Sequence, residues 1–326
     1  MMDMKKKARW LPVVMLVVLA PVMGELLSGS APPAEYFQPM TFTLLTLLYG
    51  MGALVIRETV RRWGGGWLAI LLLGFAYGIF EEGIVVHSFF DPTWMDLGLL
   101  ATYGRWLGIN WVWTIALTIF HGVVSISIPI SLTEMFFPQY SDTPWLRRRG
   151  YIAAIVLFFL NTILAPLFVQ QYSILGYIAS AVAMVILFLA ARKVSGREGT
   201  ASDLINFNQG GIIIFGFLLM VALIAGMWIL PALSIPWPMT FLFISALPWV
   251  AVAWLRKKGI KRWQGIQRWC LIFGLTLPWL LLAVTSELDN ASRPDDTSGM
   301  ILIALCFTIF LFLVRVLMVK GAKRSS

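Results

Sequence analysis

Two adjacent glutamates and one histidine are the residues of this chain whose types and positions could do chemistry. Glu81 and Glu82 lie within a long apolar stretch, and His121 lies within the next one. Charged residues in apolar spans are candidates for functional sites, because burying a charge in a membrane is costly. At about 1.5 Å per helical residue, Glu81 and His121 differ in depth by about 7 Å. We therefore expect their side chains to meet if the two helices are neighbours.

A stripe of polar residues accompanies the histidine. Thr114, Thr118, His121 and Ser125 are spaced so that they share one face of an α-helix. We predict that the two glutamates and this stripe form a site that binds a proton or a small polar solute. The alternative is that these side chains hydrogen-bond only to one another and fix the packing of the helices.

Composition places these residues in a membrane protein. The 326 residues are 59% hydrophobic and 13% charged, whereas soluble domains carry about 25% charged residues. Runs of about 20 apolar residues cross a bilayer as helices, because lipid offers no partner for a free backbone N–H or C=O. The sequence predicts an all-α polytopic protein with one transmembrane domain of about ten spans, near residues 10–27, 40–56, 67–88, 110–137, 151–171, 173–191, 211–233, 237–255, 269–286 and 299–319.

The basic residues predict how these spans are oriented. Cytoplasmic loops are enriched in Lys and Arg. With both termini in the cytoplasm, only Arg105 and Arg293 of the 25 Lys and Arg residues fall in external segments, and Arg315 falls inside the last span. We predict a multi-pass protein of the bacterial inner membrane, whose first span resembles a signal peptide but is not cleaved. The net charge of +9 then reflects topology, so we expect the lipid bilayer as a partner and no nucleic acid.

Four segments resemble an uncharacterised family of bacterial membrane proteins. They are Glu25 to Ser30, Arg57-Glu58, Tyr77 to Gly83, and His121. The resemblance covers most of the first half of the chain and implies no activity.

The glutamates and the histidine also resemble the CPBP intramembrane proteases, the CAAX protease and bacteriocin-processing family. Its motifs are Glu-Glu-x-x-x-Arg, then Phe-x-x-x-His, then His-x-x-x-Asn. Glu81-Glu82 and His121 match, but Val86 replaces the arginine, Leu117 replaces the phenylalanine, and the sequence has no later His-x-x-x-Asn. The resemblance implies that Glu81 or Glu82 is a general base that activates water, and that His121 assists or stabilises an oxyanion.

Two classes of function follow from the same residues. A carrier or ligand-binding protein would use them for a proton or a polar solute, whereas a glutamate-dependent protease would cleave a membrane peptide. We rank the carrier first, because kinked helices suit access from both faces, and leave open whether the protein is an enzyme. The sequence has no HExxH or nucleotide-binding glycine motif, and Cys270 and Cys306 lie near opposite membrane faces. We therefore expect no metal and no cofactor.

The distribution of basic residues generates a topological prediction. Reporter fusions after Gly64 and Arg149 should report the cytoplasm, whereas fusions at Pro33, Asp96 and Asp295 should report the outside, because Lys and Arg are retained on the cytoplasmic side. Activity of paired alkaline phosphatase and green fluorescent protein fusions measures this. A cytoplasmic signal at Asp295 would contradict the arrangement of ten spans.

Overall fold

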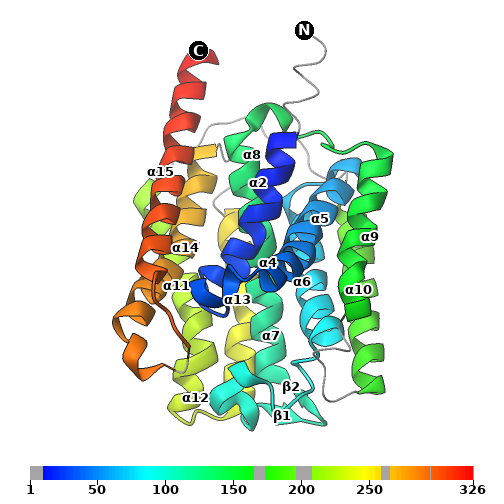
Figure 1. The fold of residues 1–326 in the computed structure, drawn as a ribbon, viewed down its shortest axis with the longest axis vertical. Helices are drawn as coiled ribbons and strands as arrows, with labels where there is room; N and C mark the ends of the chain where they lie inside the picture. The colour runs from blue at the N-terminus through cyan, green and yellow to red at the C-terminus, as the bar shows by residue number, and fades with distance from the viewer. Residues whose placement is uncertain (1–9, 165–172, 196–207, 258–264, 294, 326) are drawn as a thin grey trace.

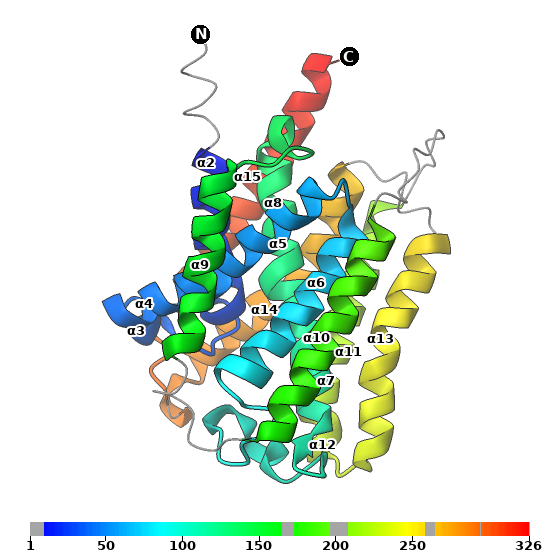
Figure 2. The same ribbon diagram turned by 90° about the vertical axis from the view of Figure 1, so that its right-hand side faces the viewer.

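Long apolar helices lie side by side along one axis of the molecule (Figures 1 and 2). The computed structural model describes residues 10–164, 173–195, 208–257, 265–293 and 295–325. Eight of the described helices are long and apolar enough to span a membrane, and the shorter apolar helix Trp10–Leu26 accompanies them. The prediction of an all-α polytopic membrane protein is confirmed. Shorter helices lie at two of the predicted spans: Trp10–Leu26, and the 17-residue α9 (Arg148–Leu164).

Several helices contain a π-helical turn, in which one extra residue is accommodated. Four long helices have none: α10 (Ile174–Val194), α13 (Trp237–Lys257), α14 (Gly265–Leu288) and α15 (Met300–Ser325). The described part of the chain has five such turns. They are η1 (Val22–Leu26) after α2 (Trp10–Pro21); η2 (Thr46–Gly50) between α4 (Pro39–Leu45) and α5 (Met51–Arg62); η3 (Glu81–Val85) after α6 (Trp67–Phe80); η5 (His121–Ser127) between α7 (Trp111–Phe120) and α8 (Ile128–Phe136); and η8 (Ala225–Ile229) between α11 (Gln209–Ile224) and α12 (Leu230–Ala232).

The connections contain short elements. A 3-10 helix, η4 (Met95–Ala101), precedes a two-stranded antiparallel ribbon of β1 (Arg105–Trp106) and β2 (Ile109–Asn110). The remaining short pieces are α3 (Pro33–Tyr36), η6 (Pro138–Tyr140) and η10 (Asn290–Ser292). In both views α3 and α4 lie beside the middle of the bundle, well away from the end that carries the β-ribbon (Figures 1 and 2).

The start of α2 and the end of α15 lie at the same end of the bundle (Figure 1). We call this the termini end, and the end with β1 and β2 the far end. The predicted cytoplasmic N-terminal segment, residues 1–9, lies outside the described residues, as do residues 165–171 of the predicted fifth span.

Burial separates central helices from peripheral ones. In the apolar stretch of Trp111–Phe136, 83% of the residues are buried, and in that of Trp67–Val85, 67% are. In the apolar stretches of α10 and α13, only 17% and 11% of the residues are buried. The central helices therefore carry the interior, and the peripheral helices present their apolar side chains outward, as helices in contact with lipid do.

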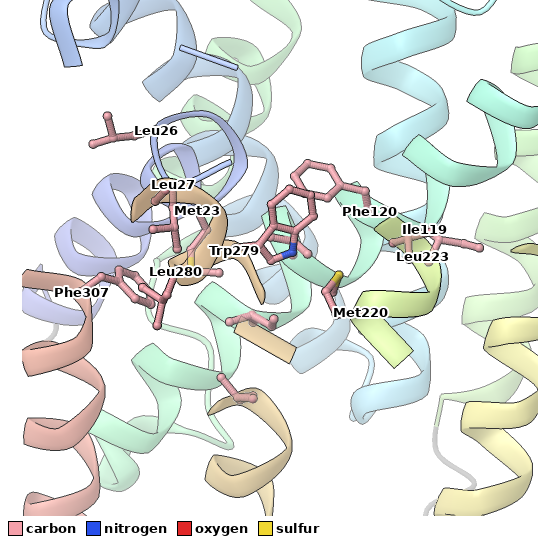
Figure 3. Close-up of a cluster of buried hydrophobic side chains, with 14 of the residues drawn as sticks. Met23, Leu26, Leu27, Ile119, Phe120, Met220, Leu223, Trp279, Leu280 and Phe307 are labelled. Carbon is pink, nitrogen blue, oxygen red and sulfur yellow. The ribbon is translucent and has the colours of Figure 1, made fainter. Parts of the chain in front are cut away.

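Two apolar clusters form the interior. The first lies on α2, α7, α11, α14 and α15 and includes Phe120, whose ring is 5.0 Å from that of Trp279; Figure 3 shows these two side chains next to each other. The second lies on η2, α5, α6 and α9 and includes Tyr49, Tyr77 and Phe158.

A buried network of charges joins α5 to α8 toward the termini end. The Arg57 side chain is fully buried, and its Nε lies 3.0 Å from Glu134 Oε1. Arg61 NH2 lies 2.6 Å from the other oxygen of Glu134. Arg57 also donates to the Tyr140, Ser141 and Thr143 carbonyls of the connection after α8. Two arginines of α5 therefore face Glu134 inside the bundle.

This network generates a prediction on stability. Glu134→Ala should destabilise the protein by about 3–5 kcal/mol, because it leaves two buried or nearly buried guanidinium groups without their carboxylate. Asp142→Ala is the control, since Asp142 is exposed on the adjoining connection. Denaturant unfolding in detergent micelles, followed by tryptophan fluorescence, measures both. Equal stability of the two variants would show that the network contributes nothing.

Candidate functional site

Glycine contacts bring α6 against α7 and η5. A Cβ on Gly74 would lie 2.8 Å from the carbonyl oxygen of Gly122, and a Cβ on Gly78 would lie 3.1 Å from both the Thr118 Cα and the His121 Cβ. Small residues four apart let membrane helices approach closely. Glu82 follows Gly78 by four residues, so the contact places its side chain toward η5.

Glu81, Glu82 and His121 meet at this contact. His121 Nε2 lies 2.9 Å from Glu82 Oε1, and His121 Nδ1 lies 3.3 Å from Glu81 Oε2. Ser125 Oγ is 3.1 Å from the same Nδ1. All four residues are buried. The contact that we expected from helix depth is therefore present, with the imidazole between the two carboxylates.

Further hydrogen bonds orient Glu82. The Ser88 hydroxyl donates to Glu82 Oε2, and the indole N–H of Trp113 donates to Ser88 Oγ at 3.0 Å. Because Oε2 is held in this way, Oε1 faces His121. Glu81 differs, since its Oε2 is buried and accepts no hydrogen bond within the described part of the chain.

Glu25 is a third carboxylate of the cluster, half-buried and not among the site residues predicted from the sequence. The Tyr49 hydroxyl donates to Glu25 Oε1, and the Tyr49 ring lies 5.9 Å from the His121 ring. A signal was available, because Glu25 is the only acidic residue of the first apolar run. Tyr49 gave no such signal, since a tyrosine in an apolar helix is common.

The cluster is built from π-helical turns. Glu25 lies in η1, Tyr49 in η2, Glu81 and Glu82 in η3, and His121 in η5. Four of the five described π-turns thus supply polar groups to one place. Such turns occur often at functional sites, because the extra residue redirects side chains and leaves backbone hydrogen bonds unformed.

A cavity of about 370 Å³ joins the cluster to the connections beyond it. Glu25, Glu81, Glu82 and His121 line its inner part. Its mouth carries acidic residues from three separate connections: Glu35, Asp96 and Asp295. The described residues that line it include no Lys or Arg. The cavity therefore presents acidic groups from its mouth to its buried end.

Asp96 shows the electrostatic character of the mouth. Its side chain is exposed within the concave surface, but partial desolvation by the surrounding protein, followed by the negative charge of Glu82, raises the pKa of Asp96 to about 6. Asp295 and Glu35 add to this shift. The mouth consequently gains a negative charge as the pH rises through about 6.

The structure does not bring every predicted site residue into the cluster. Thr114 is half-buried, and its hydroxyl donates to the Asn110 carbonyl of its own helix. Thr118 is buried and packs its backbone against Gly78. The cluster therefore contains His121 and Ser125 from the predicted stripe, and the two threonines line neither it nor the cavity described above.

His87, the other histidine, has a separate structural role. Its side chain is fully buried, with a positive φ of 64°. Its Nε2 accepts a hydrogen bond from the Ser173 N–H at 3.0 Å, and its ring stacks on Tyr177. Its Nδ1 lies 3.0 Å from the Gly83 carbonyl oxygen, which favours the neutral tautomer whose Nε2 can accept.

Comparison with known proteins agrees with the membrane architecture. A family model described as an uncharacterized membrane protein family matches residues 14–320. The chain belongs to this family. The match includes every π-turn that contributes to the cluster. No curated protein and no solved structure matches the chain. Membership of the uncharacterized membrane protein family names no activity, so function has to be argued from the site.

The glycine contact generates a prediction on how the site is positioned. Gly74→Ala should destabilise the protein by about 1–3 kcal/mol, because the new methyl group meets backbone, which cannot rotate away. Gly211→Ala is the matched control, since its Cβ would meet atoms no nearer than 3.8 Å. Unfolding in detergent measures both variants. A Gly74→Ala protein as stable as the control would mean that the helices do not depend on this contact.

Proposed function

We propose that the protein is a membrane carrier or binding protein, which takes a small polar solute or a proton into the buried Glu/His cluster. The cavity carries this proposal, because it leads from the acidic mouth to Glu81, Glu82 and His121. Its volume of about 370 Å³ falls in the range of about 300–1,000 Å³ that is usual for small-ligand sites. A cluster that only fixed helix packing would not need such a cavity.

The direction of access follows from the charges. Basic residues favour the cytoplasm for the termini end, which makes the far end external in a bacterial inner membrane. The solute would then enter from outside. On this proposal, the Arg57, Arg61 and Glu134 network is the inner gate, because it joins α5 and α8, the helices that continue from η2 and η5 toward the cytoplasm. Opening of this gate would separate α5 from α8.

Intramembrane proteolysis is the second candidate function. The 2.9 Å contact of Glu82 with His121 favours it, since a carboxylate beside an imidazole can serve as a general base pair. The arrangement supplies only part of such a centre, because no second histidine joins it: His87 is occupied by Gly83 and Ser173. The carrier accounts for the cavity and the cluster together.

A ligand screen tests the proposed function. Purified protein in detergent is heated with a panel of small solutes that includes amino acids, amines and divalent cations. We expect at least one solute to raise the melting temperature of the wild type but not of Glu82→Gln, because the variant loses the carboxylate that faces His121. Glu287→Gln is the control, with a carboxylate outside the cavity lining. Ligands identified in this way are then tested for uptake into proteoliposomes.

The same preparation decides between the two functions. Cleavage of membrane peptides by the wild type, abolished in Glu82→Gln, would overturn the carrier in favour of the protease. A screen without any solute that distinguishes the wild type from Glu82→Gln would also contradict the proposal.

A further inference from the structure

We propose that Glu81, Glu82 and His121 form a binding site for a divalent cation of the first transition row, such as Mn²⁺, Fe²⁺, Co²⁺ or Zn²⁺. This inference rests on the proposed function, since it names the solute class that the cavity takes. It departs from the expectation of no metal, which considered contiguous motifs and cysteine pairs, whereas these donors come from two different helices.

The donor atoms are already gathered. One ligand atom from each of the three residues lies within 4.8 Å of the other two. Metal bonds to carboxylate oxygen and imidazole nitrogen are about 2.0–2.2 Å long, so two donors on one ion lie at most about 4.4 Å apart. The side chains therefore need to close by only a few tenths of an ångström.

An unsatisfied acceptor points to a ligand independently of this cluster geometry. Glu81 is 3% exposed, and its Oε2 accepts no hydrogen bond within the described part of the chain. A buried acceptor without a partner costs about 1–3 kcal/mol, and more if it is charged. His121 Nδ1 lies 3.3 Å from this oxygen and is also in contact with Ser125. A cation bound by Glu81, Glu82 and the His121 ring would satisfy the oxygen.

Charge balance favours a divalent ion. Glu81 and Glu82 are buried and Glu25 is half-buried around one cavity, and the described residues lining that cavity include no Lys or Arg. Buried carboxylates need protons, a basic partner or a metal. The arginines of the termini-end network are already engaged with Glu58 and Glu134. A doubly charged ion neutralises two of the three carboxylates at once.

The surroundings have the features of a metal site's outer shell. Ser88 fixes Glu82 through Oε2 and is itself held by Trp113, which leaves Oε1 for the ion. Ser125 contacts His121 Nδ1 and thereby orients the ring. Such outer partners position ligands, and their loss typically weakens metal binding about 10- to 100-fold. The acidic mouth provides an entry path that attracts cations.

The donor set selects the class of metal. Two carboxylates and one imidazole form a mixed oxygen and nitrogen set, whereas Mg²⁺ and Ca²⁺ favour oxygen alone. No thiolate contributes, which disfavours the soft ions that prefer sulfur. First-row divalent ions with open coordination positions for water fit best.

Metal binding to the purified full-length chain tests the proposal. Chelator-treated protein in detergent is titrated with Mn²⁺, followed by electron paramagnetic resonance, and with Co²⁺, followed by visible absorption. We expect saturable binding with nitrogen and oxygen coordination, weakened at least about tenfold in Glu82→Gln and His121→Ala, and about 10- to 100-fold in Ser88→Ala. Asp296→Asn, a change in an exposed acidic connection, should bind as the wild type does.

Each contrary result has a distinct meaning. The variants Glu82→Gln and the isosteric Glu81→Gln are both checked for folding by size-exclusion profile. Metal binding that survives in both would overturn the metal site, because the ion would be bound elsewhere. Absence of metal binding, with an organic solute from the screen still dependent on Glu82, would overturn this inference but leave the carrier. If no metal and no solute depends on Glu82, both proposals fail.

Discussion

The distance between α6 and the α7–η5 segment governs the site. Without the glycine contacts at Gly74 and Gly78, a side chain on α6 would meet the backbone of the opposing helix. Glu82 and His121 would then stand too far apart to interact, and each would lose its ionisable partner inside the bundle. Lipid cannot supply a hydrogen-bond partner for a buried polar group. The site therefore requires the close packing of these helices. The two apolar clusters on either side hold this distance, since His121 touches Phe120 of the first and packs near Tyr49 and Tyr77 of the second.

Carboxylates inside the bundle have arginine partners at one level and, among the described residues, no Lys or Arg beside them at another. Toward the termini end, Arg57 and Arg61 balance Glu58 and Glu134, and backbone carbonyls take the remaining guanidinium hydrogens. Around the cavity, acidic groups gather without a Lys or Arg among the lining side chains that the structure describes. The first arrangement is complete in itself and needs no further partner. The second has an excess of acceptors, which is the condition for taking up a positively charged partner.

The sequence predicted the parts of the structure that depend on local pattern. Apolar runs located the helices, and depth counting placed Glu81 and His121 near each other, because both follow from residue spacing along one helix. Contacts between distant segments could not be read in this way. Glu25 meets Tyr49 across 24 residues, and Arg57 meets Glu134 across 77. The partners of Glu134 could not be predicted for this reason, since a single sequence does not show which helix will face it.

The π-turns also limit how far a polar stripe can be followed along one span. A helical wheel assumes a constant rotation of about 100° per residue, and one inserted residue offsets everything that follows by about that angle. The residues before His121 and those after Ser127 therefore belong to two separate wheels, although they form one continuous span. Each half can turn its own apolar face outward while the turn between them directs polar groups inward. Substitution patterns in this family should accordingly be compared one half-helix at a time, with the phase reset at every π-turn.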